Sequence, residues 1–174
     1  MSAEAGFLAV HIAAGSLGLV LGPVLFAARK ARGLHTIGGE LYHWTFLVLF
    51  LSAVGLAVLN WEEVWWLALV GAFSYSFALR GYLAAKRRGP GWIAAHISGQ
   101  GGSYISMTTA LLVVNWEDLT GQSGLASMLP WFLPTIVGAP LIALTVREVM
   151  LGRRPKAWAS RPVRPTRSGS SSAA

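Results

Sequence analysis

Residues 43–59 read HWTFLVLFLSAVGLAVL and contain no Asp, Glu, Lys or Arg. Crossing the hydrocarbon core of a bilayer takes about 20 residues in a helix, because only a helix or a closed barrel satisfies backbone hydrogen bonds without water. Comparable apolar runs lie on both sides, at residues 7–28, 64–85, 92–114 and 129–150. The sequence therefore predicts an all-α fold, a polytopic membrane helix bundle with five transmembrane helices.

The composition agrees with a lipid environment. Apolar residues make up 54% of the 174 residues and charged residues only 12%, which is too apolar for an ordinary soluble domain of this length. The net charge of +7 comes from short basic clusters beside the apolar runs, which is typical of topology signals and does not indicate nucleic-acid binding. The absence of cysteine excludes disulfides and thiolate metal sites.

Basic residues also predict the orientation, because cytoplasmic loops collect Lys and Arg. They occur at residues 29–32, at 86–88 and after residue 150, whereas the connections at 60–63 and 115–118 carry acids. We expect the N-terminus outside and the C-terminus in the cytoplasm, in the plasma (inner) membrane of a prokaryote. Residues 1–150 form the predicted transmembrane domain. Residues 151–174 are rich in Pro, Arg and Ser and are predicted to form a disordered basic tail.

Polar side chains inside a membrane span are costly and mark candidate functional sites. Near the predicted cytoplasmic ends, His43 begins the second run, Arg80 lies in the third and His96 lies in the fourth. Gln100 and Ser103 share a helical face with His96. We therefore expect a pocket in the cytoplasmic half of the bundle, lined by Tyr42, His43, Arg80, His96, Gln100 and Ser103.

The first run carries His11, Gly15, Gly18 and Gly22 at helical spacing. Gly18 and Gly22 form a GxxxG pair, a pattern that lets another helix approach closely. This face is predicted to pack against a neighbouring helix.

The pocket leaves several ligands open. His43 and His96 on facing helices would suit the axial positions of a haem b in an electron-transfer protein, with Arg80 binding a propionate. A metal site of three histidines would need His35 to fold back at residues 38–39. An anionic head group or a quinone could use the same cation and donors.

The leading interpretation is an integral membrane protein of undefined activity with this pocket. No Gly-x-Ser-x-Gly, His-Glu-x-x-His or phosphate-loop motif is present, so an enzyme is disfavoured. The sequence also fits a small dimeric transporter, because Pro130, Pro134 and Pro140 could break or kink the fifth run. The expected partners are the lipid bilayer and either a second copy of the chain or another membrane subunit.

The same three residues, Asn-Trp-Glu, follow the second run at residues 60–62 and the fourth run at residues 115–117. A duplicated helical hairpin would produce such a pattern. Interface residues that recur in membrane proteins would produce it too.

Three segments resemble an uncharacterised prokaryotic multi-pass membrane family, a domain of unknown function. They are the His-x3-Gly of His11 and Gly15, the His-x3-Gly-x2-Tyr of residues 35–42, and the His-x6-Ser-Tyr of residues 96–104. The resemblance covers residues 7–115 and implies a helical membrane fold without an agreed activity. It draws attention to His11, Gly15, His35, Gly39 and Tyr104. Thr36 and Gly102 stand where the family pattern usually has arginine.

Overall fold

The structure is a computed structural model that describes residues 2–30 and 33–153. Its described residues form helices, which confirms the predicted all-α class. The elements are α1 (Ala3–Ala27), α2 (Leu34–Leu59), α3 (Trp61–Arg87), α4 (Trp92–Thr120), the short 3-10 helix η1 (Gly124–Met128) and α5 (Leu129–Met150). Apart from residues 151–153, the predicted tail lies outside the described residues.

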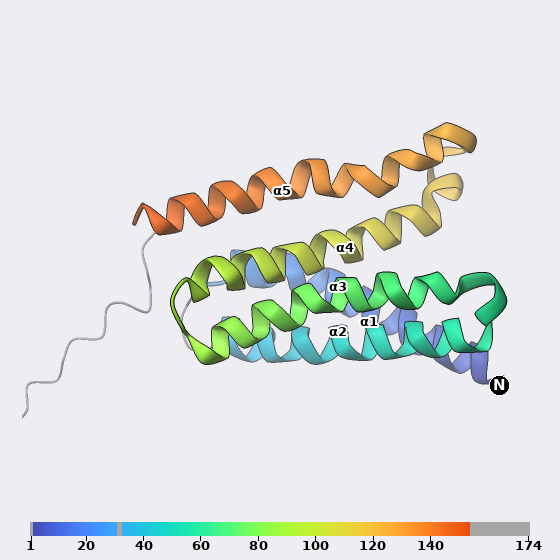
Figure 1. The fold of residues 1–174 in the computed structure, drawn as a ribbon, viewed down its shortest axis with the longest axis horizontal. Coiled ribbons are helices and arrows are strands. Elements are labelled where there is room, and N and C mark those ends of the chain that lie inside the picture. Colours follow the sequence, from blue (N-terminus) through green and yellow to red (C-terminus); the bar gives the residue numbers. More distant parts are fainter. Residues whose placement is uncertain (1, 31–32, 154–174) are drawn as a thin grey trace, which may run out of the picture.

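Each of the five α-helices runs antiparallel to the helix before it in the chain (Figure 1). The ends of α1, α3 and α5 therefore lie with the beginnings of α2 and α4 at one end of the molecule. This end holds residues 29–30 and 86–88, and we call it the basic end. It is the end that the sequence predicts to be cytoplasmic.

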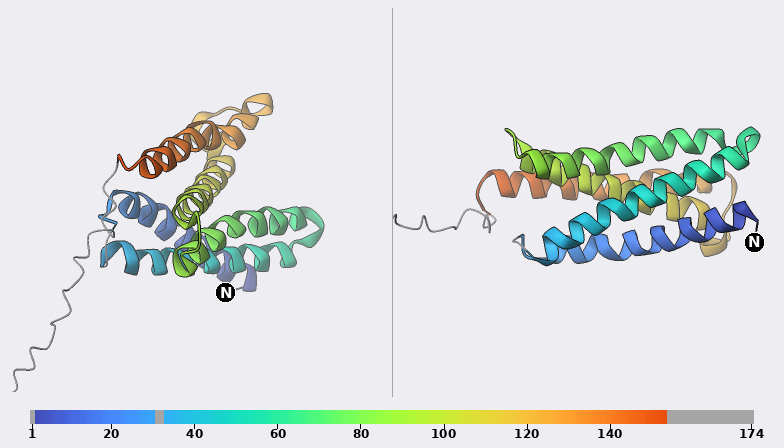
Figure 2. Two further views of the ribbon diagram at one scale, coloured as in Figure 1. Left: turned by 60° about the vertical axis from the view of Figure 1, so that its left-hand side comes forward. Right: turned by 90° about the horizontal axis from the view of Figure 1, so that it is seen from below.

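Helices α1 to α4 form a closed ring, because each packs on the next and α4 also packs on α1. Helix α5 stands outside this ring and packs along α4, as Figure 2 shows. Consequently α4 has neighbours on three sides, namely α1, α3 and α5.

Helices α1, α2 and α3, and the segment from η1 through α5, are long and apolar enough to cross a membrane. Many of their large apolar side chains are exposed, which suits helices that face lipid. Helix α4, the expected fourth span, is not among these candidates. Its glycines and polar side chains lower its apolar content, and its neighbours bury Ser103 and partly bury His96 and Gln100.

Several helix ends differ from the sequence-based expectation. Helix α2 begins at Leu34, well before the expected start at residue 43, so the segment that includes His35 is helical. Helix α4 continues through Asn115 to Thr120 and ends at Gly121, whose φ of +67° suits glycine. Asn60 instead links α2 directly to α3. The two Asn-Trp-Glu segments thus have different local structures, which counts against a duplicated hairpin.

Glycines set the closest helix contacts in the ring. A Cβ added at Gly99 of α4 would lie 2.5 Å from the backbone nitrogen of Gly81 and 2.7 Å from the carbonyl oxygen of Phe77, both on α3. Gly18 and Gly22 of α1 are buried against Met107 and Tyr104 of α4. The GxxxG pair therefore faces α4, but it makes room for the large side chains of Met107 and Tyr104 and does not bring the two helix backbones close together.

Candidate functional site

Helix α4 has a polar face, formed by His96, Gln100 and Ser103, that points into the ring of helices. The His96 ring contacts α3 through a 2.9 Å hydrogen bond between Nδ1 and the carbonyl oxygen of Gly81. One turn later the Gln100 amide donates to the carbonyl oxygen of Ala78 on α3 at 3.2 Å. Ser103 then contacts α2, so this face ties three helices of the ring together.

Tyr42 and Ser103 meet in the middle of the bundle. Their hydroxyls lie 3.0 Å apart, Tyr42 is 3% exposed and Ser103 is 0% exposed. Ser103 also donates to the carbonyl oxygen of Gln100 at 2.8 Å, so Tyr42 is the donor in the bond between the two side chains. The sequence predicted both residues as pocket members, and the structure places them together as a buried tie between α2 and α4.

Substitutions at this tie are expected to have unequal effects. Ser103→Ala leaves the buried Tyr42 hydroxyl without its acceptor and should lower the free energy of unfolding by about 1–3 kcal/mol. Tyr42→Phe removes the donor but leaves Ser103 bonded to Gln100, so its cost should be smaller, about 0.5–1.5 kcal/mol. Titration of the purified protein with SDS in mixed micelles measures both values, and equal costs would contradict this assignment of donor and acceptor.

A pair of histidines lies at the basic end. The rings of His35 on α2 and His96 on α4 have their centroids 6.1 Å apart and stand nearly perpendicular, at 88°. The apolar pattern predicted that His35 would lie in a cytoplasmic connection. Because α2 begins at Leu34, the side chain is instead carried by a helix at the level of His96.

Both rings are held in the same way. Nδ1 of His35 faces the carbonyl oxygen of Leu25 at 3.3 Å, and Nδ1 of His96 faces that of Gly81. A carbonyl oxygen only accepts, so each Nδ1 is the protonated nitrogen and each neutral ring carries its lone pair on Nε2. A backbone carbonyl on one ring nitrogen is the usual support of a histidine that binds metal through the other.

Lys30 lies beside the pair. Its ammonium donates to the carbonyl oxygens of Leu25 and Phe26 at 2.6 and 2.8 Å and caps the end of α1. It is also close enough to interact electrostatically with both His35 and His96. Lys30 was not predicted as a site residue, because a lysine in a basic cluster beside an apolar run signals only topology.

His43 has different neighbours. Its ring stacks on Tyr82 of α3, with centroids 3.9 Å apart, and it also lies near Trp44 and Tyr75. The Tyr82 hydroxyl donates to Glu40 at 2.8 Å, and Glu40 forms an ion pair with Lys86. His43 is 5% exposed and its buried Nδ1 has no hydrogen-bond partner within the described chain.

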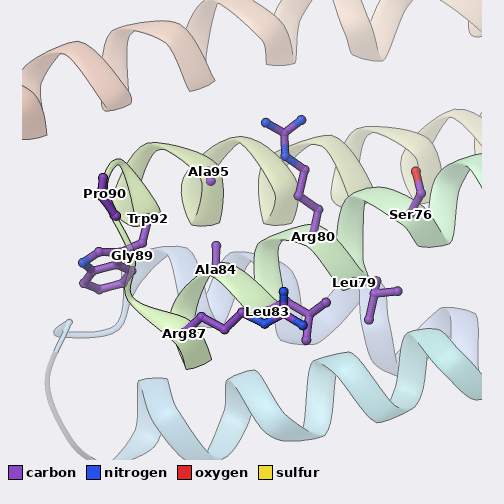
Figure 3. A pocket seen from close by; sticks show the side chains of 10 residues that line it. All are labelled: Ser76, Leu79, Arg80, Leu83, Ala84, Arg87, Gly89, Pro90, Trp92 and Ala95. Atoms are coloured by element: carbon purple, nitrogen blue, oxygen red, sulfur yellow. The ribbon is translucent and has the colours of Figure 1, made fainter.

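Arg80 also faces away from the histidine pair. It is exposed and lines a groove of about 470 Å³ on the outer side of α3 and α4. Figure 3 shows its side chain extending toward α5, together with Ser76. The contacts therefore do not bring the expected trio of His43, Arg80 and His96 together.

The remaining family-like positions occupy several sites. His11 lies near the other end of the bundle, where its Nδ1 is 3.2 Å from both the Leu49 carbonyl oxygen and the Ser52 hydroxyl. Gly15 faces Leu49, and Tyr104 donates to the carbonyl oxygen of Leu19 at 3.2 Å. At Gly39, an added Cβ would meet no atom within 4 Å.

Neither the three-histidine metal site nor the broken transporter helix gains support from the geometry. Among the described residues no group of three His, Asp or Glu side chains could hold a metal ion, so the three-histidine site is not formed there. Helix α5 continues without interruption through Pro134 and Pro140, in contrast to the broken helix expected for a transporter. The geometry instead gathers His35, His96 and Lys30 at the basic end.

The comparisons with known proteins leave the family open. The chain matches no family model, no curated protein and no solved structure. The resemblance to an uncharacterised membrane family therefore stays a prediction.

Proposed function

We propose that this chain is an integral membrane protein that binds a haem b between His35 and His96 and passes electrons to a membrane partner. The observation that carries the proposal is the paired arrangement of the two rings at 6.1 Å. A metal held by two imidazole nitrogens at about 2 Å each would keep the ring centres roughly 6 Å apart, since each nitrogen lies about 1 Å from its ring centre.

The number of ligands favours haem over a bare ion. Structural ions such as Zn²⁺ take about four ligands, whereas haem brings its own four equatorial nitrogens and needs only two axial side chains. His35 and His96 supply two, and no third histidine or acid of the described chain joins them. Bound haem would supply one-electron chemistry between its ferric and ferrous states.

The open space at Gly39 and the positive charge of Lys30, both beside the His35–His96 pair, also favour haem as the ligand. Gly39 lies one turn after His35 on the same face of α2, and the space around its missing side chain is open. A flat macrocycle held by His35 would need such space. Lys30 provides a cation for a propionate, the role that the sequence-based hypothesis assigned to Arg80.

The proposal also includes the predicted topology. Five spans with the basic end in the cytoplasm would place the haem near the cytoplasmic surface of a prokaryotic plasma membrane. The alternation of basic and acidic connections supports this orientation. A haem close to one surface can exchange electrons with a soluble or membrane-bound partner on that side.

The test is an absorption spectrum of the full-length protein purified from cells supplied with haem. We expect a Soret band and the spectrum of a low-spin, bis-histidine haem. His35→Ala and His96→Ala should each lower the bound haem by about tenfold or more, because the loss of one axial ligand removes half of the protein's attachment to the iron.

His43→Ala is the matched control, because His43 lies near the same end but packs on Tyr82. It should leave the haem content unchanged. Haem that depends on His43, or wild-type protein that lacks haem after adequate supply, would contradict the proposal. Metal analysis of the same samples distinguishes haem from a bare ion bound by the two histidines.

A further inference from the structure

A second groove lies on the outer side of α4, between α3 and α5. It has a volume of about 830 Å³ and includes Phe77 of α3, Ser98 and Ile105 of α4, and Ala139 and Arg147 of α5. It arises because α5 packs mainly on α4 and meets α3 at the Trp66–Trp131 ring pair, so that α3 and α5 are otherwise apart.

Polarity is distributed unevenly along this groove. Arg147 lies three residues before the end of α5 at Met150, roughly 5 Å from the basic end, and Ser98 lies six residues after the start of α4. Deeper in the groove, the wall consists mainly of phenylalanine, isoleucine and alanine side chains. The lining reaches Thr135, twelve residues before Arg147, so the groove is roughly 18 Å long.

Two arginines near this groove lack an acidic partner within the described chain: Arg147, which lines it, and Arg80, which lines the neighbouring groove of about 470 Å³. The ion pairs of the described residues join Lys86 to Glu40 and Arg153 to Glu148, and neither includes Arg80 or Arg147. Arg80 extends from α3 toward α5, as Figure 3 shows, and Arg147 lines the groove from α5. An exposed guanidinium beside an apolar groove is satisfied by an anion that carries apolar chains.

We propose that this groove binds one anionic phospholipid of the cytoplasmic leaflet, with its phosphate between Arg80 and Arg147 and an acyl chain along α4. The groove length of roughly 18 Å is close to half of a hydrocarbon core of about 30 Å, as a lipid of one leaflet requires. The lipid fills the gap between α3 and α5 and completes the packing of α5.

The test uses the full-length protein in dodecyl maltoside, with phosphatidylglycerol as the probe and native mass spectrometry to count bound lipid. We expect one phosphatidylglycerol per chain and clearly weaker binding of phosphatidylcholine. Arg80→Gln and Arg147→Gln should each weaken phosphatidylglycerol binding roughly fivefold. Arg29→Gln is the matched control, because Arg29 is an exposed arginine at the same end, just after α1 and outside the groove. It should change binding little.

A second pair of variants tests the apolar part. Ala139→Phe places a ring in the groove and should abolish the one-to-one binding, whereas Val137→Phe, at an exposed position of α5 outside the lining, should preserve it. Equal losses in the Arg29 and Arg147 variants would indicate general surface attraction and overturn the proposal. Equal binding of phosphatidylcholine would also overturn it. A dimer in light scattering that Ala139→Phe dissolves would assign the groove to a second copy of the chain. None of these outcomes depends on haem.

Discussion

Gly99→Ala is expected to lower the free energy of unfolding by about 1–3 kcal/mol or more, although alanine normally favours a helix. The added methyl would lie 2.5 Å from the backbone nitrogen of Gly81 and 2.6 Å from its Cα. These atoms belong to the α3 backbone and cannot turn aside as a side chain can. Helices α3 and α4 must therefore separate, and the His96–Gly81 hydrogen bond lengthens with them.

Gly6→Ala is the control for this substitution. Gly6 also lies inside a helix, but an added Cβ would meet nothing within 4 Å. The exchange should stabilise the protein slightly, by about 0.5–1 kcal/mol, through helix propensity alone. Unfolding in SDS mixed micelles measures both variants, and a Gly99 variant as stable as the wild type would show that the two backbones are not in contact.

Gly39→Phe is expected to reduce haem content by roughly tenfold or more while the protein without haem keeps its stability. The reason is steric, because Gly39 lies one turn beyond His35 with open space at its Cβ position. A phenyl ring would fill the space that the macrocycle needs. A bare metal ion between the histidines needs no such space, so this variant separates the two ligands.

Ile37→Phe is the matched control on the same helix. Ile37 is 71% exposed and lies on another face of α2, so the ring should not disturb the histidine pair. Haem content comes from the Soret absorbance per protein, and metal content from elemental analysis. If the Gly39 variant kept full haem occupancy, the haem would have to bind elsewhere on the molecule.

The helices were predictable because their apolar runs have the length that a bilayer requires. The extent of α2 was not. The second run was expected to begin at residue 43, with Gly38 and Gly39 in the connection before it, yet Gly38 is buried against Leu25 of α1 and the helix continues through both residues. A glycine that weakens an isolated helix can be the residue that allows two helices to pack, and sequence alone does not distinguish these cases.

The candidate site was predicted in part. Depth along the spans grouped His43, Arg80 and His96 at one end, but depth carries no information about direction around a helix. His43 lies eight residues after His35, so it points roughly 80° away on α2. It therefore faces Tyr82 of α3, while His35 faces His96. Likewise Gly81 faces α4, so its neighbour Arg80 points roughly 100° away, toward the outer groove.

The ring of α1 to α4 contains both histidines of the pair and the carbonyl groups that support them, and α5 contributes none of these. Residues 3–120 therefore supply every side chain and carbonyl group of the proposed cofactor site, and α5 follows them in the chain. A truncated chain that lacks α5 would therefore keep both histidines and the two carbonyl groups that support them.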